Sequence, residues 1–291
     1  MKKLLTFVAL YALMATSIAA QNTKLTSKMV YHNGPVLTGT KPIYLIWYGC
    51  WGTEYCGSSG DNQTIEMMIT FLINLGGSPY AQINSTYTDA SGQPAASQFA
   101  VGGTVNDYSY SRGVDLTKLD MTSIISDQIN SFRLPQDPDG IYVILSSADI
   151  ASNETEFCKP GAPPHHAIGI VNGALVNYIF LGHPRRCPSS AGPQFSPSGP
   201  TPHNTYAGDV LVSNLAHALN AHVTNPRGNG WYDRYGLENA DKCQDALGNP
   251  SFGPTYLTAN GARANVRFGD RDYLIQQNWV NDRRARCAMS R

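Results

Sequence analysis

The chain contains few charged residues. Only 14% of its 291 residues are Asp, Glu, Lys or Arg, against about 25% in typical proteins. The 21 basic and 21 acidic residues give a formal net charge of zero. Proteins that bind nucleic acid usually present a basic face, so this composition argues against a nucleic-acid partner. The sequence also lacks an apolar run of the roughly 20 residues that a membrane span requires, so none is predicted.

Signatures of several enzyme classes are missing as well. No Gly-x-Ser-x-Gly turn is present to expose a nucleophilic serine. No Walker loop is present to bind phosphates, and no Cys-x-x-Cys pair favours a zinc ribbon. The sequence therefore gives no support to a serine hydrolase, a P-loop enzyme or a zinc ribbon.

The first 20 residues have the features of an export signal. Lys2 and Lys3 precede a short apolar run, Leu4 to Ala15, and small residues follow at positions 17–20. We predict cleavage after Ala19 or Ala20. The remaining residues, 21–291, contain no evident linker and predict one secreted domain.

The six cysteines are even in number, which favours disulfides in an exported protein. The sequence alone leaves their pairing open. Neighbours along the chain suggest the bonds Cys50–Cys56, Cys158–Cys187 and Cys243–Cys287.

Hydrophobic patterning predicts a mixed α/β fold. Apolar runs predict buried strands, and apolar residues at helical spacing predict helices between turn-forming residues. The expected strands are 43–48, 83–88, 140–145 and 174–181, and the expected helices are 61–75, 121–132 and 208–224. We expect 184–202 to be a long surface loop and the chain after Pro226 to be mostly irregular.

The predicted helix 208–224 resembles a metal-hydrolase helix without its carboxylates. His217 is followed by Ala218, where a general-base Glu would stand, and by Ala221, one turn further on. His222 is five positions from His217, about 140° around the helix, so these two cannot readily bind one ion. The His165-His166 pair follows two prolines and is expected in a solvent-facing loop.

Three motifs identify a family resemblance. They are Tyr31-His-Asn-Gly-Pro-Val-Leu-Thr-Gly39, Trp47-Tyr-Gly49 and Thr224-Asn-Pro-x-Gly-Asn-Gly230. Together they resemble the EXORDIUM-like, phosphate-induced family of extracellular plant proteins and their microbial relatives, from about residue 28 to 287. The resemblance implies a secreted protein linked with the cell wall and apoplast.

The resemblance also implies a degenerate zincin-like site. Some relatives carry a zinc-protease-like helix followed by an acidic pair. Their pattern places the first ligand at His217, the base at Ala218, the second ligand at Ala221 and the acidic pair at Glu238 and Asp241. Without a base or an i+4 ligand we expect no catalysis and no cofactor, with His217, Glu238 and Asp241 as a vestigial metal site.

Aromatic residues supply a second candidate site. Trp51 lies between two cysteines, and Trp231 and Tyr232 follow the His217 helix. Their flat apolar rings could bind sugar at the surface, although aromatic residues are also common in cores.

Three functions follow from the sequence. The first is a secreted, non-catalytic binding or signalling protein at the cell exterior or wall, whose ligand would be a cell-wall glycan or a protein. The second is a zinc-dependent hydrolase with an atypical ligand set. The third is a carbohydrate-binding protein.

Overall fold

The computed structural model describes residues 27–52, 61–192, 194–245 and 249–291. The predicted signal peptide, residues 1–20, lies outside these ranges, as does Cys56.

A five-stranded mixed sheet, in the order β3-β2-β4-β6-β5, forms the centre of the domain. Its strands are β2 (Thr40–Tyr48), β3 (Gln98–Asp107), β4 (Ile141–Ser146), β5 (His165–Val171) and β6 (Ala174–Leu181). Strands β2, β3, β4 and β6 pair in parallel, and β5 pairs antiparallel to β6 at one edge. The three central strands are the ones that near-continuous apolar runs predict, because both of their faces are buried.

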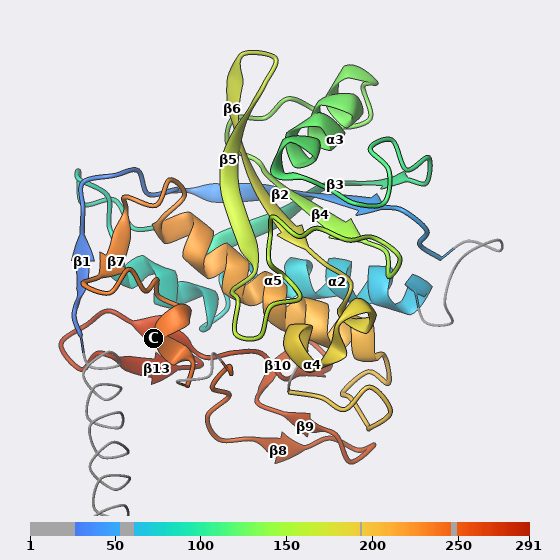
Figure 1. Cartoon of the computed structure of the whole chain (residues 1–291). Coiled ribbons are helices and arrows are strands. Elements are labelled where there is room, and N and C mark those ends of the chain that lie inside the picture. Colours follow the sequence, from blue (N-terminus) through green and yellow to red (C-terminus); the bar gives the residue numbers. More distant parts are fainter. Residues whose placement is uncertain (1–26, 53–60, 193, 246–248) are drawn as a thin grey trace, which may run out of the picture.

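Helices cover both faces of the sheet. Helices α2 (Asp61–Leu75) and α5 (Tyr206–Thr224) lie on one face, and α3 (Lys118–Asn130) lies on the other, as Figure 1 shows. An apolar core lies on each face of the sheet, and alternate residues of β2 point into one or the other. Ile43, Leu45 and Trp47 pack with residues of α2 and α5. Tyr44, Ile46 and Tyr48 pack with residues of α3. The fold is therefore a single mixed α/β domain, as predicted.

Helix α5 lies inside the molecule. The Thr205 side chain accepts a hydrogen bond from the backbone of Gly208 and caps its start. Every residue of the helix except Asn214 is buried, because the sheet packs on one side and C-terminal segments pack on the other. Polar side chains of α5 consequently need partners within the protein.

The C-terminal third consists of short segments held together by pairing and by a disulfide. Three two-stranded pairs form there: β8 (Tyr256–Leu257) with β9 (Arg263–Ala264), β10 (Val266–Phe268) with β11 (Arg271–Tyr273), and β12 (Asn278–Val280) with β13 (Arg286–Ala288). The predicted bonds Cys243–Cys287 and Cys158–Cys187 are confirmed. Cys50 is also disulfide-bonded, but its predicted partner Cys56 lies outside the described residues.

Two local predictions are wrong. The expected strand 83–88 is largely a 3-10 helix, η1 (Ala81–Thr86). The hydroxyls of Ser85 and Thr86 donate to carbonyls three residues back, and such local bonds compete with strand pairing. The expected loop 184–202 contains a 3-10 turn, η2 (Pro184–Arg186), and a short helix, α4 (Pro188–Ala191), each beginning with a proline.

The first and third sequence motifs pack against each other. Strand β1 (Met29–Tyr31) pairs antiparallel with β7 (Trp231–Asp233). Backbone hydrogen bonds continue this pairing, because Gly34 N donates to Asn229 O at 2.8 Å and Leu37 N donates to Val223 O at 2.9 Å. The two motifs are thus one structural unit at the C-terminal end of α5.

No helix in the described part of the chain combines the length and the apolar character needed to cross a membrane.

We predict that Gly34→Ala destabilises the protein by about 1–3 kcal/mol, the usual cost of overpacking. A Cβ at Gly34 would lie 2.3 Å from the backbone oxygen of Asn229, which cannot move without breaking the contact between the motifs. Gly199→Ala is the matched control, since the atom nearest to a Cβ added there would be a side-chain carbon of Ser196, at 3.2 Å. Urea denaturation of both variants tests this, and equal midpoints would contradict it.

Candidate functional site

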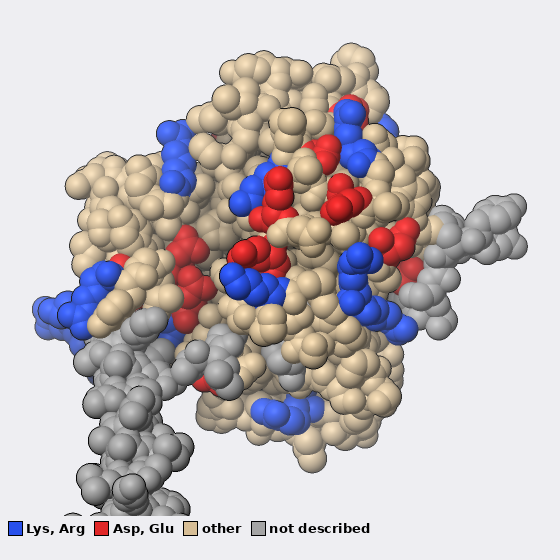
Figure 2. Space-filling model, in the orientation of Figure 1, with Lys and Arg blue, Asp and Glu red and all other residues tan. Residues whose placement is uncertain are grey.

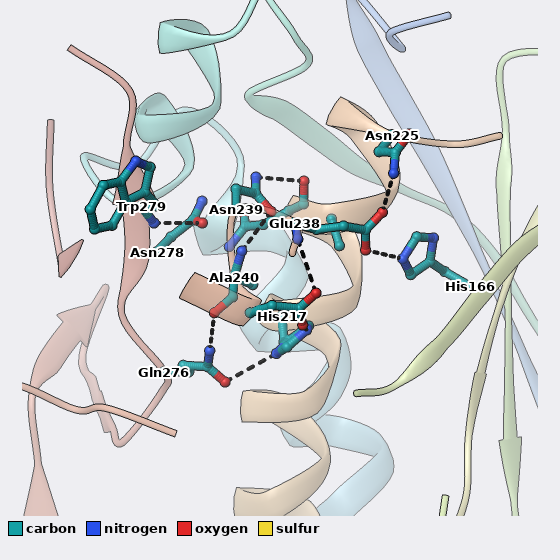
Figure 3. Close-up of polar contacts among 12 residues, drawn as sticks. His166, His217, Asn225, Glu238, Asn239, Ala240, Gln276, Asn278 and Trp279 are labelled. Atoms are coloured by element: carbon teal, nitrogen blue, oxygen red, sulfur yellow. Dashed lines mark hydrogen bonds and ion pairs between the residues drawn. The ribbon is translucent and has the colours of Figure 1, made fainter. Parts of the chain in front are cut away.

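His217 lies on α5, and its imidazole ring contacts two side chains, Gln276 and Asp241. Its Nδ1 lies 3.0 Å from Oε1 of Gln276. Gln276 Nε2 donates to the carbonyl of Ala240, so Oε1 is the acceptor for the imidazole N–H. The other ring nitrogen, Nε2, lies 3.2 Å from Oδ1 of Asp241, an ion-pair contact that lacks the alignment of a hydrogen bond. His217 is 2% exposed, and Figure 3 shows its contact with Gln276.

Asp241 carries its charge inside the protein. Burial alone would raise the pKa of this carboxyl, but the contacts with His217 outweigh burial and lower the pKa below its ordinary value. Its second oxygen accepts a hydrogen bond from the backbone of Glu238 at 3.1 Å. The structure therefore brings Asp241 to His217, while Glu238 contributes only its backbone to that contact.

The Glu238 side chain points to a different histidine. Its Oε2 lies 2.8 Å from Nε2 of His166 on β5, and its Oε1 accepts a hydrogen bond from Asn225 (Figure 3). Asn225 belongs to the Thr-Asn-Pro motif, and its own oxygen accepts the backbone N–H of Gly230. The third motif therefore fixes the carboxylate of Glu238.

A second buried histidine lies behind His166. Nδ1 of His222 is 3.3 Å from Nδ1 of His166. Burial lowers the pKa of His166, but the Glu238 carboxylate outweighs burial and the pKa is raised. Burial, and then the charge of His166, hold the pKa of His222 well below its ordinary value. The two shifts favour the charged form of His166 and the neutral form of His222.

The expectation that His165 and His166 lie in a solvent-facing loop is wrong. Both lie at the start of strand β5 and are half-buried. They contact different partners, as neighbours in a strand do: His165 lies near the Tyr178 hydroxyl and His166 near Glu238. The preceding prolines indicate the start of the strand, and nothing in the local sequence signals a buried partner.

Residues after Asp241 anchor the same segment. Lys242 and Asp233 are 0% exposed and form an ion pair at 3.1 Å. The Lys242 ammonium also lies 4.7 Å from the centre of the Trp279 ring. Cys243 is bonded to Cys287. Residues 238–243 are therefore fixed at several consecutive positions.

The side chains near His217 do not fit a catalytic zinc. Such a zinc takes three protein ligands and keeps one open position. In the described ranges no three His, Cys, Asp or Glu side chains are grouped closely enough to hold a metal ion. Glu238 is bonded to His166 and Asn225, and both Ala218 and Ala221 are 0% exposed and offer only methyl groups.

A cavity of about 340 Å³ lies beside His217. The loop after Cys158 forms one wall, and residues just after Cys187 form another. Asn214, His217 and Gln276 line its inner side, with Phe157, Phe180 and Leu181. This volume is near the lower end of the range for ligand pockets, about 300–1,000 Å³.

The aromatic candidates do not form one surface. Trp51 is 1% exposed and belongs to the main core, with its Nε1 donating to the Leu145 carbonyl, so the expectation of a surface role is wrong for it. The tight turn after β2 carries this ring inward, where it packs edge-on against Trp47. Trp231 and Tyr232 are half-buried in β7.

Neighbouring rings cover the two remaining candidates. Tyr232 stacks on His32 at 3.5 Å between ring centres, and Trp231 stacks on Tyr31 at 5.3 Å. Trp231 also donates to the carbonyl of Thr88. These rings take part in the contact between the first and third motifs.

Comparison with known proteins identifies the family. Residues 29–289 match the conserved region of phosphate-induced protein 1. The chain belongs to this family. It is 30% identical to EXORDIUM-like 3 of Arabidopsis thaliana over 280 residues, covering 87% of this chain and 80% of that protein.

Other family members are similar over comparable lengths. Identity to EXORDIUM of Arabidopsis thaliana is 26% over 278 residues, covering 86% of this chain and 84% of the relative. Identity to PHOSPHATE-INDUCED 1 of Nicotiana tabacum is 25% over 233 residues, covering 73% and 71%. No solved structure matches the chain, so the zincin-like part of the fold prediction is not confirmed.

Family membership and structure together revise the list of site residues. Sequence reasoning missed His166, Asn225 and Gln276. Only Asn225 had a signal, its place in the third motif. His166 and Gln276 come from distant segments, and only the folded chain brings them to α5.

We predict that Asp241→Asn lowers the free energy of unfolding by about 2–4 kcal/mol. The change leaves the His217 imidazole buried without its charged partner, and breaking a buried pair costs about 3–5 kcal/mol. Glu156→Gln is the control, since Glu156 pairs with Lys159 at 3.2 Å and both side chains are more than half exposed; it should cost less than about 1 kcal/mol. Chemical denaturation measures both, and equal losses would contradict a structural role for Asp241.

A second prediction concerns His183, which adjoins the cavity-lining Gly182. Its Nδ1 accepts a hydrogen bond from the backbone of Arg185, and burial lowers its pKa to about 4. The unfolded chain therefore binds more protons than the folded one between about pH 6.5 and pH 4. Stability should fall as pH falls through this window, by up to about 1.4 kcal/mol per pH unit.

The variant His183→Asn keeps an acceptor for Arg185 but cannot be protonated in this range. Unfolding free energies at pH 7, 6 and 5 should decline less steeply for this variant than for the unaltered protein. Parallel pH profiles of the two proteins would show that His183 does not contribute to the pH dependence of stability.

Proposed function

We propose that this chain is a secreted, non-catalytic protein that binds a ligand outside the cell, in a binding or signalling role at the cell exterior or wall. The cavity beside His217 is the proposed ligand site. One observation supports the proposal most directly. His217 contacts Asp241 and Glu238 contacts His166, so side chains typical of a metal site interact with one another, and His217 lines a cavity.

Two features support secretion. The chain contains the disulfides Cys158–Cys187 and Cys243–Cys287, and disulfides form and persist mainly in oxidising compartments. The first 20 residues have the composition of an export signal.

We also propose that His217, Glu238 and Asp241 are retained for structure. Each contacts a different segment: His217 contacts Gln276 and Asp241, and Glu238 contacts His166 and Asn225. Of these residues, His217 and Gln276 line the cavity. Zinc-dependent hydrolysis has weaker support, because the general base and the i+4 ligand are replaced by buried alanines.

Titration with zinc and a peptidase assay test the proposal together. We expect no saturable heat on adding ZnCl₂ to the purified protein after treatment with a chelator. We also expect no cleavage of a fluorogenic peptide library with zinc present, and the same result for His217→Ala. One equivalent of tightly bound zinc with cleavage that His217→Ala abolishes would falsify the non-catalytic assignment.

A further inference from the structure

The walls of the cavity are fixed before any ligand arrives. Phe157 and residues 160–164 stand on one side, and Ser189 and Ser190 stand on the other. The bond between Cys158 and Cys187 joins these two sides. Such a pre-organised site loses less conformational entropy on binding than one whose loops must first be ordered.

The aromatic wall depends on a glycine. A Cβ at Gly182, at the end of β6, would lie 2.1 Å from the Phe157 ring. Glycine at this position lets the Phe157 ring lie against the end of the strand and pack edge-on against Phe180 at 5.8 Å. The cavity thus has a flat apolar surface on one side, suited to the face of a ring.

Among the described residues, the lining of the cavity contains no acid, lysine or arginine. The polar groups facing the cavity are hydroxyls, side-chain amides and the His217 ring, which belong to Ser189, Ser190, Gln194, Asn214, His217, Gln244, Asn249 and Gln276. At Gln194, Nε2 is buried and has no hydrogen-bond partner in the described part of the chain. A buried amide without a partner is costly, so a ligand that supplies an acceptor would be favoured.

This chemistry selects among ligand classes. An anion or a cation would lose its water without gaining an opposite charge in the lining. A wholly apolar ligand would leave Nε2 of Gln194 without an acceptor. A neutral ligand with many hydroxyls satisfies both conditions, because each hydroxyl donates and accepts and the faces of its rings are apolar.

The outer surface is consistent with a neutral ligand. On the face drawn in Figure 2, acidic and basic side chains are interspersed between wide areas of other residues. No field of one sign would steer a charged ligand to this face.

Resting on the proposed binding function, we propose that the cavity beside His217 binds a small neutral saccharide unit, such as the end of an uncharged glycan. The modest volume suits a small ligand rather than a long polymer segment. The site is the cavity between the Cys158–Cys187 loops and α5, and it does not use Trp51, Trp231 or Tyr232.

Matched sugar pairs test the proposal on the full-length mature protein. Ligand-observed NMR titrations would compare glucose with glucuronic acid and galactose with galacturonic acid, and would include cellobiose, xylobiose and maltose. At least one neutral sugar should bind, at least tenfold more tightly than its uronic acid, because the carboxylate would meet no cation in the lining.

Two variants place the binding in the cavity. Ala162→Trp fills the cavity from its wall, and Asn214→Leu removes a lining amide from α5. Each should weaken binding at least tenfold. Ala285→Trp, which lines a separate cavity near Ser27, and Asn130→Leu on the exposed side of α3 are controls that should bind as the unaltered protein does.

The other outcomes overturn the inference. It is wrong if no neutral sugar binds, if uronic acids bind equally well, or if binding survives Ala162→Trp. Binding of the peptide acetyl-Ala-Ala-Ala-amide alone, lost in Ala162→Trp, would overturn the saccharide assignment and leave the proposed binding function intact. Cleavage of that peptide would instead overturn the non-catalytic function.

Discussion

The contact between His217 and Asp241 is the interaction on which the interior of this protein depends. Helix α5 is buried on nearly all sides, so its polar side chains cannot reach bulk water. The His217 imidazole and the Asp241 carboxylate lie 3.2 Å apart there as an ion-pair contact, and Gln276 bonds the other ring nitrogen. Removing either partner would leave an unpaired polar group at the centre of the domain.

The family motifs explain how this interior is assembled. The first and third motifs meet through backbone hydrogen bonds at the end of α5. Asn225 in the third motif then bonds Glu238, which bonds His166 on the sheet edge. Asp241 and Cys243 follow in the same segment and connect it to α5 and to the C-terminal strands. Motifs that are far apart in the sequence therefore position one continuous polar layer.

Local patterns predicted the parts of the fold that are regular and fully buried. The apolar runs gave β2, β4 and β6, and helical spacing gave α2, α3 and α5 to within a few residues. Strand β3 was missed because it lies at a sheet edge, contains Gly102-Gly103 and alternates between buried and exposed positions. Strand β5 was missed because two prolines precede it and its first two residues are polar histidines, which the fold leaves half-buried.

The site was predictable only in part, for a similar reason. His217 and Asp241 were found from a motif that occurs in relatives, and the structure brings them together. Glu238 was expected beside His217 but bonds His166, a residue from another strand. Such pairing depends on how the sheet edge and α5 approach each other, and no spacing along the chain encodes it. Trp51 was assigned to the surface because it lies near two cysteines, whereas its large apolar ring packs in the core.

The central claim is that side chains with the chemistry of a metal site now stabilise the protein by binding one another. A double-mutant cycle with His166→Asn, Glu238→Gln and the double variant tests it most directly. Unfolding free energies at pH 7 should show a coupling of at least about 1 kcal/mol, because the two side chains are 2.8 Å apart and only 13% exposed. Additive effects, within about 0.5 kcal/mol, would contradict the account and show that the contact contributes nothing to stability.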